Sequence, residues 1–141
     1  MSRGVAPNVA PSAKSQEMSR VRSRDTAPEL LVRKLLSSRG VRYRLRRKDL
    51  PGRPDVYVSR LRLAIFVNGC FWHGHNCARG RKPATNVEFW ESKIARNVDR
   101  DVAAIRALAE RGIESRVVWT CSLKDFKGVA DDVARRYRRA T

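Results

Sequence analysis

A short Cys- and His-rich segment follows an apolar run near the middle of the chain and holds its densest group of reactive side chains. Cys70, His73, His75 and Cys77 lie close together there, and a third thiol, Cys121, follows a later apolar run. Structural zinc sites are tetrahedral and use thiolate and imidazole ligands. If the two apolar runs form neighbouring strands, Cys121 can complete such a site with Cys70, Cys77 and one histidine. His75 is the better fourth ligand, because it gives a tight Cys-x4-His-x-Cys hairpin and leaves His73 free.

The number and setting of the cysteines favour metal binding over disulfides. Three cysteines are an odd number, which argues against a disulfide framework and leaves metal ligation or simple burial. In the second case the thiols act as small apolar side chains and His75 is an ordinary loop histidine. The loop from 69 to 84 is long and has little apolar content, so structural zinc would supply folding free energy that its side chains cannot.

A second candidate is the carboxylate that ends the segment Leu50-Pro51-Gly52-Arg53-Pro54-Asp55. Two prolines and a glycine fix a turn and deliver Asp55 at the first residue of a strand. One carboxylate, a main-chain carbonyl and waters suit magnesium bound to a phosphodiester. The alternative is that Asp55 caps the turn or pairs with Arg53.

Phe71 and Trp72 stand between the candidate zinc ligands, on a loop whose polarity would normally exclude large rings. On a basic protein, exposed aromatic side chains suggest stacking on bases or wedging between them. Alternatively, they pack against the metal site or cover the edge of the sheet.

The charge of the chain points to a polyanionic partner. Lys and Arg number 31 against 14 Asp and Glu, a formal charge of +17. Nucleic acid is the leading candidate, and a ribosomal or chromatin packing protein or a peripheral membrane protein are the alternatives. There is neither an apolar run of signal-peptide length in residues 1–16 nor one long enough to span a membrane, so we expect a soluble, cytoplasmic protein.

Hydrophobic periodicity and capping signals predict the elements that must position these residues. Residues 1–16 are expected to form a flexible, basic N-terminal arm, and residues 17–141 one domain. Capping boxes at Thr26–Glu29 and Thr85–Glu88 open two helices, and the continuous apolar run 63–67 predicts a central strand buried on both faces. The expected elements are a helix to residue 39, strands 41–45, 55–58 and 63–67, a helix to about 112, a strand 115–119 and a helix 129–139. This αβββαβα order predicts an α/β fold with a central mixed sheet flanked by helices.

With these residues assembled, the chain resembles the very short patch repair (Vsr) DNA mismatch endonucleases, a bacterial family. The similarity runs from about Lys14 to Cys121. The matching residues are Met18, Arg24-Asp25-Thr26-Ala27, Glu29, Leu50-Pro51-Gly52-Arg53-Pro54-Asp55, Gly69-Cys70-Phe71-Trp72-His73, His75, Cys77, Pro83-Ala84-Thr85, Glu88-Phe89-Trp90, Lys93-Ile94, Asn97-Val98, Arg100-Asp101 and Val118-Trp119.

The resemblance implies a restriction-endonuclease-like core and a magnesium-dependent hydrolysis that nicks one strand beside the thymine of a T:G mismatch. It implies that Asp55 and the carbonyl of Val67 bind Mg²⁺, and that His73 activates the attacking water. Glu29 and Asp101 match acidic positions near the site. The residues that match structural zinc ligands are Cys70, His75, Cys77 and Cys121, and those that match DNA-contacting positions are Met18, Phe71, Trp72 and Asn68.

Two departures from the family pattern concern the same site. Val67-Asn68 stands where the family has Thr-His, so Asn68 cannot move a proton as that histidine could, and Gly74 replaces a further histidine. The partner is expected to be double-stranded DNA with a T:G mismatch, together with repair factors, for a monomer at the bacterial nucleoid. The alternatives are a related nuclease without mismatch preference and a non-catalytic, zinc-stabilised nucleic-acid-binding module. The enzymatic hypothesis requires Asp55 and His73 to converge on one phosphate.

Overall fold

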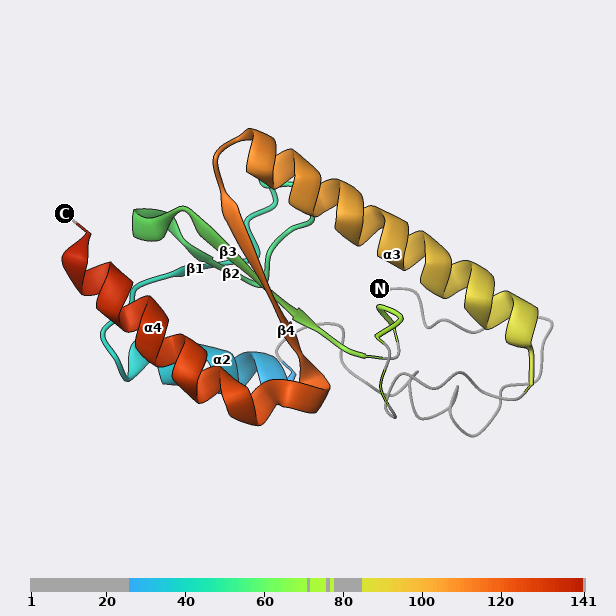
Figure 1. The fold of residues 1–141 in the computed structure, drawn as a ribbon, viewed down its shortest axis with the longest axis horizontal. Coiled ribbons are helices and arrows are strands. Elements are labelled where there is room, and N and C mark those ends of the chain that lie inside the picture. The colour runs from blue at the N-terminus through green and yellow to red at the C-terminus, as the bar shows by residue number, and fades with distance from the viewer. Residues whose placement is uncertain (1–25, 71, 76, 78–84, 141) are drawn as a thin grey trace.

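The computed structural model describes residues 26–70, 72–75, 77 and 85–140. The predicted arm 1–16, Met18 and Phe71 lie outside these residues. The elements are, in order, α2 (Ala27–Ser37), β1 (Arg44–Leu45), β2 (Val56–Val58), the 3-10 helix η1 (Ser59–Leu61), β3 (Leu63–Asn68), α3 (Val87–Glu110), β4 (Glu114–Trp119), the 3-10 helix η3 (Thr120–Asp125) and α4 (Phe126–Arg139). The predicted order of helix, three strands, helix, strand and helix is confirmed (Figure 1).

The sheet has four strands in the order β1-β2-β3-β4. β1 and β2 pair antiparallel, as do β2 and β3, whereas β3 and β4 run parallel with Asn68 opposite Trp119. The sheet is therefore mixed and β3 is internal, as the continuous apolar run predicts. Because β3 and β4 point the same way, the segments that follow them emerge at one edge of the sheet.

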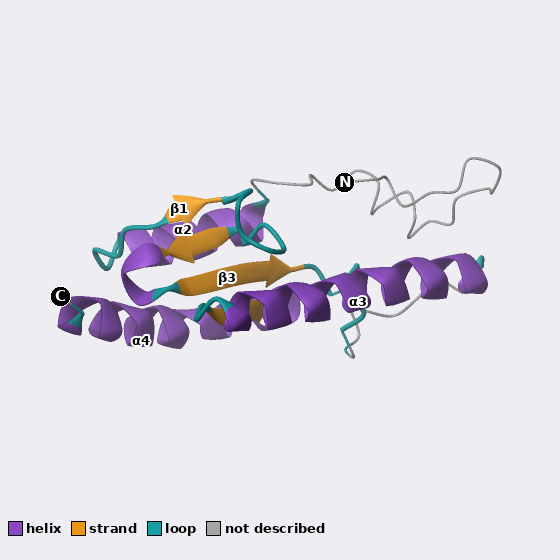
Figure 2. Ribbon diagram, turned by 90° about the horizontal axis from the view of Figure 1, so that it is seen from above, coloured by secondary structure: helices purple, strands orange, loops and turns teal. Residues whose placement is uncertain are grey.

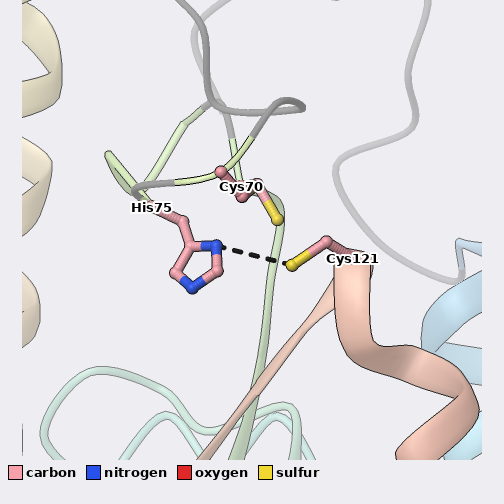
Figure 3. Close-up of side chains that lie close together, drawn as sticks. Cys70, His75 and Cys121 are labelled. Carbon is pink, nitrogen blue, oxygen red and sulfur yellow. Dashed lines mark hydrogen bonds between the residues drawn. The ribbon is translucent and has the colours of Figure 1, made fainter.

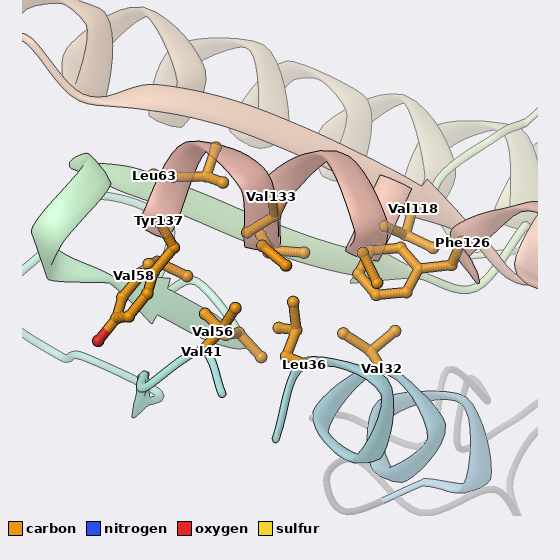
Figure 4. Packing of buried hydrophobic residues seen from close by; sticks show 13 residues of the cluster. Val32, Leu36, Val41, Val56, Val58, Leu63, Val118, Phe126, Val133 and Tyr137 are labelled. Atoms are coloured by element: carbon orange, nitrogen blue, oxygen red, sulfur yellow. The ribbon is translucent and has the colours of Figure 1, made fainter. Parts of the chain in front are cut away.

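The two faces of the sheet are covered differently. α2 and α4 lie side by side on one face, and α3 crosses the other (Figure 1). The larger core lies between the sheet and the α2–α4 pair (Figure 4), and its members from α2, the sheet and α4 include Val32, Leu36, Val56, Val58, Leu63, Ile65, Val118, Phe126, Val133 and Tyr137. A smaller cluster on the other face packs Tyr57, Ala64 and Leu108 with their neighbours. Successive strand residues thus alternate between the two clusters, as the pleat requires.

α3 runs along β3, and its N-terminal half extends beyond the end toward which β3 points (Figure 2). There Trp90 is buried and contacts Trp72 of the segment that follows β3, with ring centroids 5.8 Å apart. The overhanging half of α3 therefore supports the Cys- and His-rich loop.

Three boundary predictions were wrong. β1 has two residues instead of five, because Val41 is buried under α2 and α4 before the chain joins the sheet. The Thr85 capping box is not formed: α3 begins at Val87 after Asn86, a left-handed residue whose side chain makes no capping hydrogen bond. α4 starts at Phe126, three residues before the prediction, because the Phe126 ring anchors the first turn in the core. The other ends agree with the prediction or differ from it by at most two residues. Among the described residues, no helix is long and apolar enough to cross a membrane.

Candidate functional site

Three thiols and one imidazole meet at the edge of the sheet where β3 and β4 end. Cys70 follows β3 by two residues, and Cys121 follows β4 by two. The parallel pairing of these strands brings the two thiols together across fifty residues of sequence. Cys77 and His75 come from the loop after Cys70. The ligand atoms of all four residues lie within 4.8 Å of one another.

The donor set fits zinc. The Nδ1 atom of His75 lies 3.5 Å from the sulfur of Cys121, and the sulfur of Cys70 lies beside them (Figure 3). In a tetrahedral site with Zn–S bonds of about 2.3 Å, sulfurs lie about 3.8 Å apart. A small contraction of the cluster therefore brings all four atoms into ligand geometry. The cluster indicates a structural zinc site of the predicted composition.

The electrostatics of the thiols also favour a cation. Burial raises the pKa of Cys70, but hydrogen bonds from Thr120 and from the backbone of Cys121 outweigh it and bring this pKa to about 7. Burial and the neighbouring thiols raise the pKa of Cys121 to about 11. One thiolate thus suppresses ionisation of the next, and a divalent metal removes that conflict by binding all of them as thiolates.

Backbone hydrogen bonds and one ring contact hold His75 and Cys77 in the described part of the loop. The amide of His75 donates to the carbonyl of Cys70 at 3.0 Å, and the amide of Cys77 donates to the carbonyl of His75 at 2.9 Å. The imidazole of His75 stacks on Trp119, with ring centroids 4.2 Å apart and an interplanar angle of 20°. The stacking orients His75 toward the thiols.

The side chain of His73 contacts α3. Its Nδ1 atom lies 2.5 Å from a carboxylate oxygen of Asp101. Because a carboxylate only accepts hydrogen bonds, Nδ1 carries the hydrogen and Nε2 keeps a free lone pair. One turn earlier on α3, the amide of Asn97 donates to the carbonyl of Trp72 at 2.8 Å. Together Asn97 and Asp101 hold the backbone before His73 and the ring itself.

Two glycines let the segments that carry the candidate catalytic residues approach α3 closely. A Cβ on Gly74, whose φ is +65°, would lie 2.8 Å from Ile94 Cγ2, and one on Gly52, whose φ is +77°, would lie 2.6 Å from the Cβ of Ala104. Any larger residue would therefore be strained in its backbone and would collide with α3. Gly52 precedes Asp55 and Gly74 follows His73, so both candidate catalytic residues are positioned against one helix.

Asp55 lies at the start of β2, beside the backbone of β3. The amide of Val67 donates to its carboxylate at 2.7 Å. Burial raises the pKa of Asp55 to about 6; the Val67 hydrogen bond opposes this rise, the charge of Glu29 adds to it, and the charges of Arg46 and His73 lower it. Asp55 is therefore within electrostatic reach of both Glu29 and His73, at the same end of the sheet.

Glu29 is a buried carboxylate, 5% exposed, on the first turn of α2. The Thr26 hydroxyl caps this turn by accepting from the Glu29 amide, as predicted. The Glu29 carboxylate lies 3.5 Å from a nitrogen of Arg33 and 3.6 Å from one of Arg46. Charge on two arginines therefore stabilises an acidic group next to Asp55.

A groove runs between α3 and the turn that carries Asp55. Its volume is about 500 Å³. The residues that line it are Pro51, Gly52, His73, Asn97, Arg100, Asp101, Ala103, Ala104 and Ala107. The small alanine side chains of α3 leave this space open, so His73 faces a hollow that a phosphodiester can enter.

Two of the residues predicted to contact DNA are buried in the structure. Trp72 is 8% exposed and packs edge-on against Trp90, so in the free protein it is a packing residue. Asn68 is also buried and lines a small pocket with Asp101. Their contacts with DNA stay predictions.

Sequence reasoning gave no role at the site to Asn97, Arg100, Arg46 or Gly74, and it gave Gly52 a role only in the turn before Asp55. Asn97 and Asp101 are four residues apart on a helix, which places both on one face. That spacing could have indicated that Asn97 and Asp101 act on the same segment. The roles of Arg46 and the glycines depend on contacts between distant segments, which spacing does not reveal.

Comparison with known proteins places the chain among DNA nicking enzymes. Residues 8–79 match the family described as DNA mismatch endonuclease Vsr. The chain is 47% identical over 122 residues to the type II nicking enzyme V.XorIIP of Xanthomonas oryzae pv. oryzae, covering 86% of this chain and 90% of that protein. It is 41% identical over 114 residues to the type II nicking enzyme V.NmeAIP of Neisseria meningitidis serogroup A, covering 81% of each. It is 40% identical over 121 residues to the DNA mismatch endonuclease Vsr of Escherichia coli K12, covering 86% of this chain and 78% of that protein.

Proposed function

Since the chain belongs to the DNA mismatch endonuclease Vsr family and is a nicking endonuclease, we propose that it cuts one strand of double-stranded DNA beside the thymine of a T:G mismatch. The observation that carries this proposal is the His73–Asp101 pair, which faces a groove next to the turn of Asp55. A relative of 40% identity is named a DNA mismatch endonuclease. The charge of +17 suits a polyanionic substrate.

His73 is the general base of this proposal. Asp101 accepts the Nδ1 hydrogen, which fixes the tautomer and stabilises the imidazolium that forms. Nε2 takes a proton from water while the water oxygen bonds to phosphorus. The bond from phosphorus to the leaving oxygen breaks, and that oxygen takes a proton from solvent water. Asn97 and Gly74 keep the ring in place during this step. Arg100, which lines the same groove, supplies positive charge for the phosphate.

Asp55, with the main-chain carbonyl of Val67, is the proposed holder of Mg²⁺. Both offer the hard oxygen ligands that this ion prefers. The fit is supported by the surroundings: Asp55 is a poorly solvated carboxylate whose pKa is raised to about 6 by burial, and the acidic Glu29 lies nearby. A divalent cation stabilises such an arrangement. When bound there, it supplies charge stabilisation for the phosphate.

The test is a nicking assay on labelled duplexes that differ only in one pair, T:G or T:A. The wild-type protein should nick the T:G duplex in magnesium buffer and not in magnesium-free buffer, where no chelator is added that could strip the zinc site. Asp55→Asn and His73→Gln should lose nicking and keep DNA binding. Asp99→Asn removes an exposed carboxylate on α3, the helix that carries Asp101, and this variant should behave as wild type.

Each failure has its own meaning. Equal nicking of both duplexes would reject mismatch specificity and leave a related nuclease without this preference. Retention of nicking in both Asp55→Asn and His73→Gln would reject the catalytic assignment. Tight binding with no nicking under any condition would favour the non-catalytic binding module.

A further inference from the structure

A second, larger groove lies along the edge strand of the sheet and extends away from the candidate catalytic site. Its volume is about 870 Å³, and its walls come from β1 and its flanks, η1, and the last turn of α4. Four arginines and two tyrosines dominate the lining: Arg42, Arg44, Arg47, Arg60, Tyr43 and Tyr137. We call it the arginine groove. The function proposed above does not use it.

The strand register fixes its distance from the catalytic end. Arg46 donates its amide to the carbonyl of Asp55, and Arg44 lies opposite Tyr57. The lining of the arginine groove therefore starts beside Asp55 and continues past β2 to Ser59 of η1, four residues from Asp55. At about 3.3 Å per residue, the far end of the groove lies about 13 Å from Asp55 along the strands.

Some of its cations are fixed in place before any ligand binds. The guanidinium of Arg60 lies 4.1 Å from the centroid of the Tyr137 ring and donates to the Tyr137 carbonyl at 3.4 Å. Arg47 makes two hydrogen bonds to Asp49, of 2.7 and 2.6 Å. A cation held in this way loses little freedom when it binds an anion. Arg42 and Arg44 are exposed on the edge strand and its flank.

The charge of the groove has one sign. The described residues that line it include no carboxylate. Asp49, the partner of Arg47, offsets one of the four positive charges, which leaves about three in a single hollow. The catalytic groove, in contrast, contains Asp101 beside Arg100. The arginine groove is thus the more strongly anion-attracting of the two.

We propose that the arginine groove binds the phosphate backbone of the duplex at a distance from the nick. This inference rests on the proposed function in one respect, namely that the substrate is double-stranded DNA. At 3.4 Å per base pair, 13 Å corresponds to about four base pairs. A duplex that runs along β1 from the Asp55 end brings phosphates about four pairs from the nick into the groove. These contacts set register and affinity without reading sequence.

A phosphate backbone suits the groove better than an acidic protein segment does. One guanidinium group can bind two oxygens of a phosphate at once. The arginines here follow one another along a strand, as phosphates do along a nucleic acid. The lining offers a single large aliphatic side chain, Leu45, to anchor a peptide.

The experiment compares two double variants that each lose two positive charges. Arg42→Gln/Arg44→Gln alters the groove, and Lys127→Gln/Arg135→Gln is the control, since both of its residues are exposed on α4 and neither lines a described groove. Binding to a 30-base-pair T:G duplex is measured from 50 to 200 mM salt, together with the single-turnover nicking rate at saturating protein.

The groove variant should bind about tenfold more weakly than the control at 100 mM salt. Its slope of log affinity against log salt should be smaller by about two, one for each lost phosphate contact. Its saturated nicking rate should equal that of the control, because the groove does not touch the reacting phosphate. When the duplex is shortened to two base pairs on the side of the nick that enters the groove and keeps its full length on the other side, the difference between the variants should vanish.

Equal affinities and slopes of the two variants would overturn the inference. So would a difference that persists on the shortened duplex, because the lost contacts would then lie near the nick. The nicking assay on wild-type protein separates this outcome from failure of the proposed function: a protein that binds the duplex but does not nick it fails the function, while the comparison of variants still decides the role of the groove.

Discussion

Asp55 is predicted to destabilise the fold at neutral pH while it serves the reaction. Its carboxylate is largely removed from water, and burial is the main cause of the rise in its pKa to about 6. Asp55→Asn keeps an oxygen that can accept the Val67 amide and removes the charge. We expect the variant to be inactive and, in the absence of magnesium, more stable than wild type.

The magnitude follows from the two pKa values. A carboxyl that titrates at about 6 in the native state and at 3.8 in the unfolded state binds its proton more tightly when folded. Ionisation therefore costs stability as the pH rises from about 4 to about 6, and the cost is complete above that range. A difference of about two pKa units corresponds to about 3 kcal/mol at pH 8, and to about 1 kcal/mol at pH 4.5.

Thermal and denaturant unfolding of both proteins at pH 8 and pH 4.5 measures this difference. For a domain of this size, 3 kcal/mol raises Tm by roughly 10 °C. Added magnesium should stabilise wild type and not the variant, by about 1.4 kcal/mol for a tenfold excess over Kd. Asp49→Asn is the matched control with the opposite sign, because Arg47 lowers the pKa of Asp49 to about 2; its substitution should destabilise at pH 8.

Two results would refute the reasoning about Asp55. If Asp55→Asn is less stable than wild type at pH 8 without magnesium, the native state stabilises the carboxylate, and the loss of hydration on burial does not outweigh its favourable contacts. If the difference between the two proteins does not shrink toward pH 4.5, it does not arise from ionisation of Asp55 at all.

Three further changes test other parts of the site. Asp101→Asn should lower the single-turnover nicking rate about a hundredfold or more with a small change in Tm, because the amide can also donate to Nδ1, so that the tautomer of His73 is no longer fixed, and because the negative charge that stabilises the imidazolium is lost; an unchanged rate would contradict this. Cys121→Ser should lower the zinc content measured by metal analysis and broaden thermal unfolding, and a full zinc complement would show that Cys121 is not a ligand. Gly74→Ala should destabilise by about 1–3 kcal/mol through its positive φ and its contact with α3, whereas Gly128→Ala, in a helix with open space around it, should be neutral or stabilising.

Much of the fold could be predicted because it depends on local patterns. The run 63–67 is apolar at every position, and only an internal strand with helices on both faces buries such a run, as β3 does. Thr26 could be assigned as a helix cap from its own hydroxyl and the residues that follow. Thr85 carries the same signal and does not cap, because the backbone at Asn86 is left-handed and the helix begins one residue later. Tertiary packing selects whether the helix starts after Thr85 or after Asn86, and the local sequence does not determine this choice.

Those parts of the site that depend on local sequence patterns could also be predicted. The four members of the Cys/His cluster could be predicted from donor types and from the expectation that β3 and β4 are neighbours, which they are. Trp72 shows the limit: its position on a polar loop suggested exposure, yet α3 extends far enough past the sheet for Trp90 to bury it. The length of a helix can be read from sequence, but which segments lie under its overhanging end cannot.

The Cys/His cluster and α3 act on the same short segment from its two sides, and together they hold the candidate catalytic residue His73 in place. His73 lies between Cys70 and His75, so the cluster fixes the chain before and after it. α3 fixes the side chain through Asp101 and the preceding backbone through Asn97. Positioning a reacting group to within about 0.5 Å requires such support from surrounding contacts. Loss of the metal should therefore lower the nicking rate at temperatures where the sheet and its helices are still folded, because α3 alone restrains only one side of the loop.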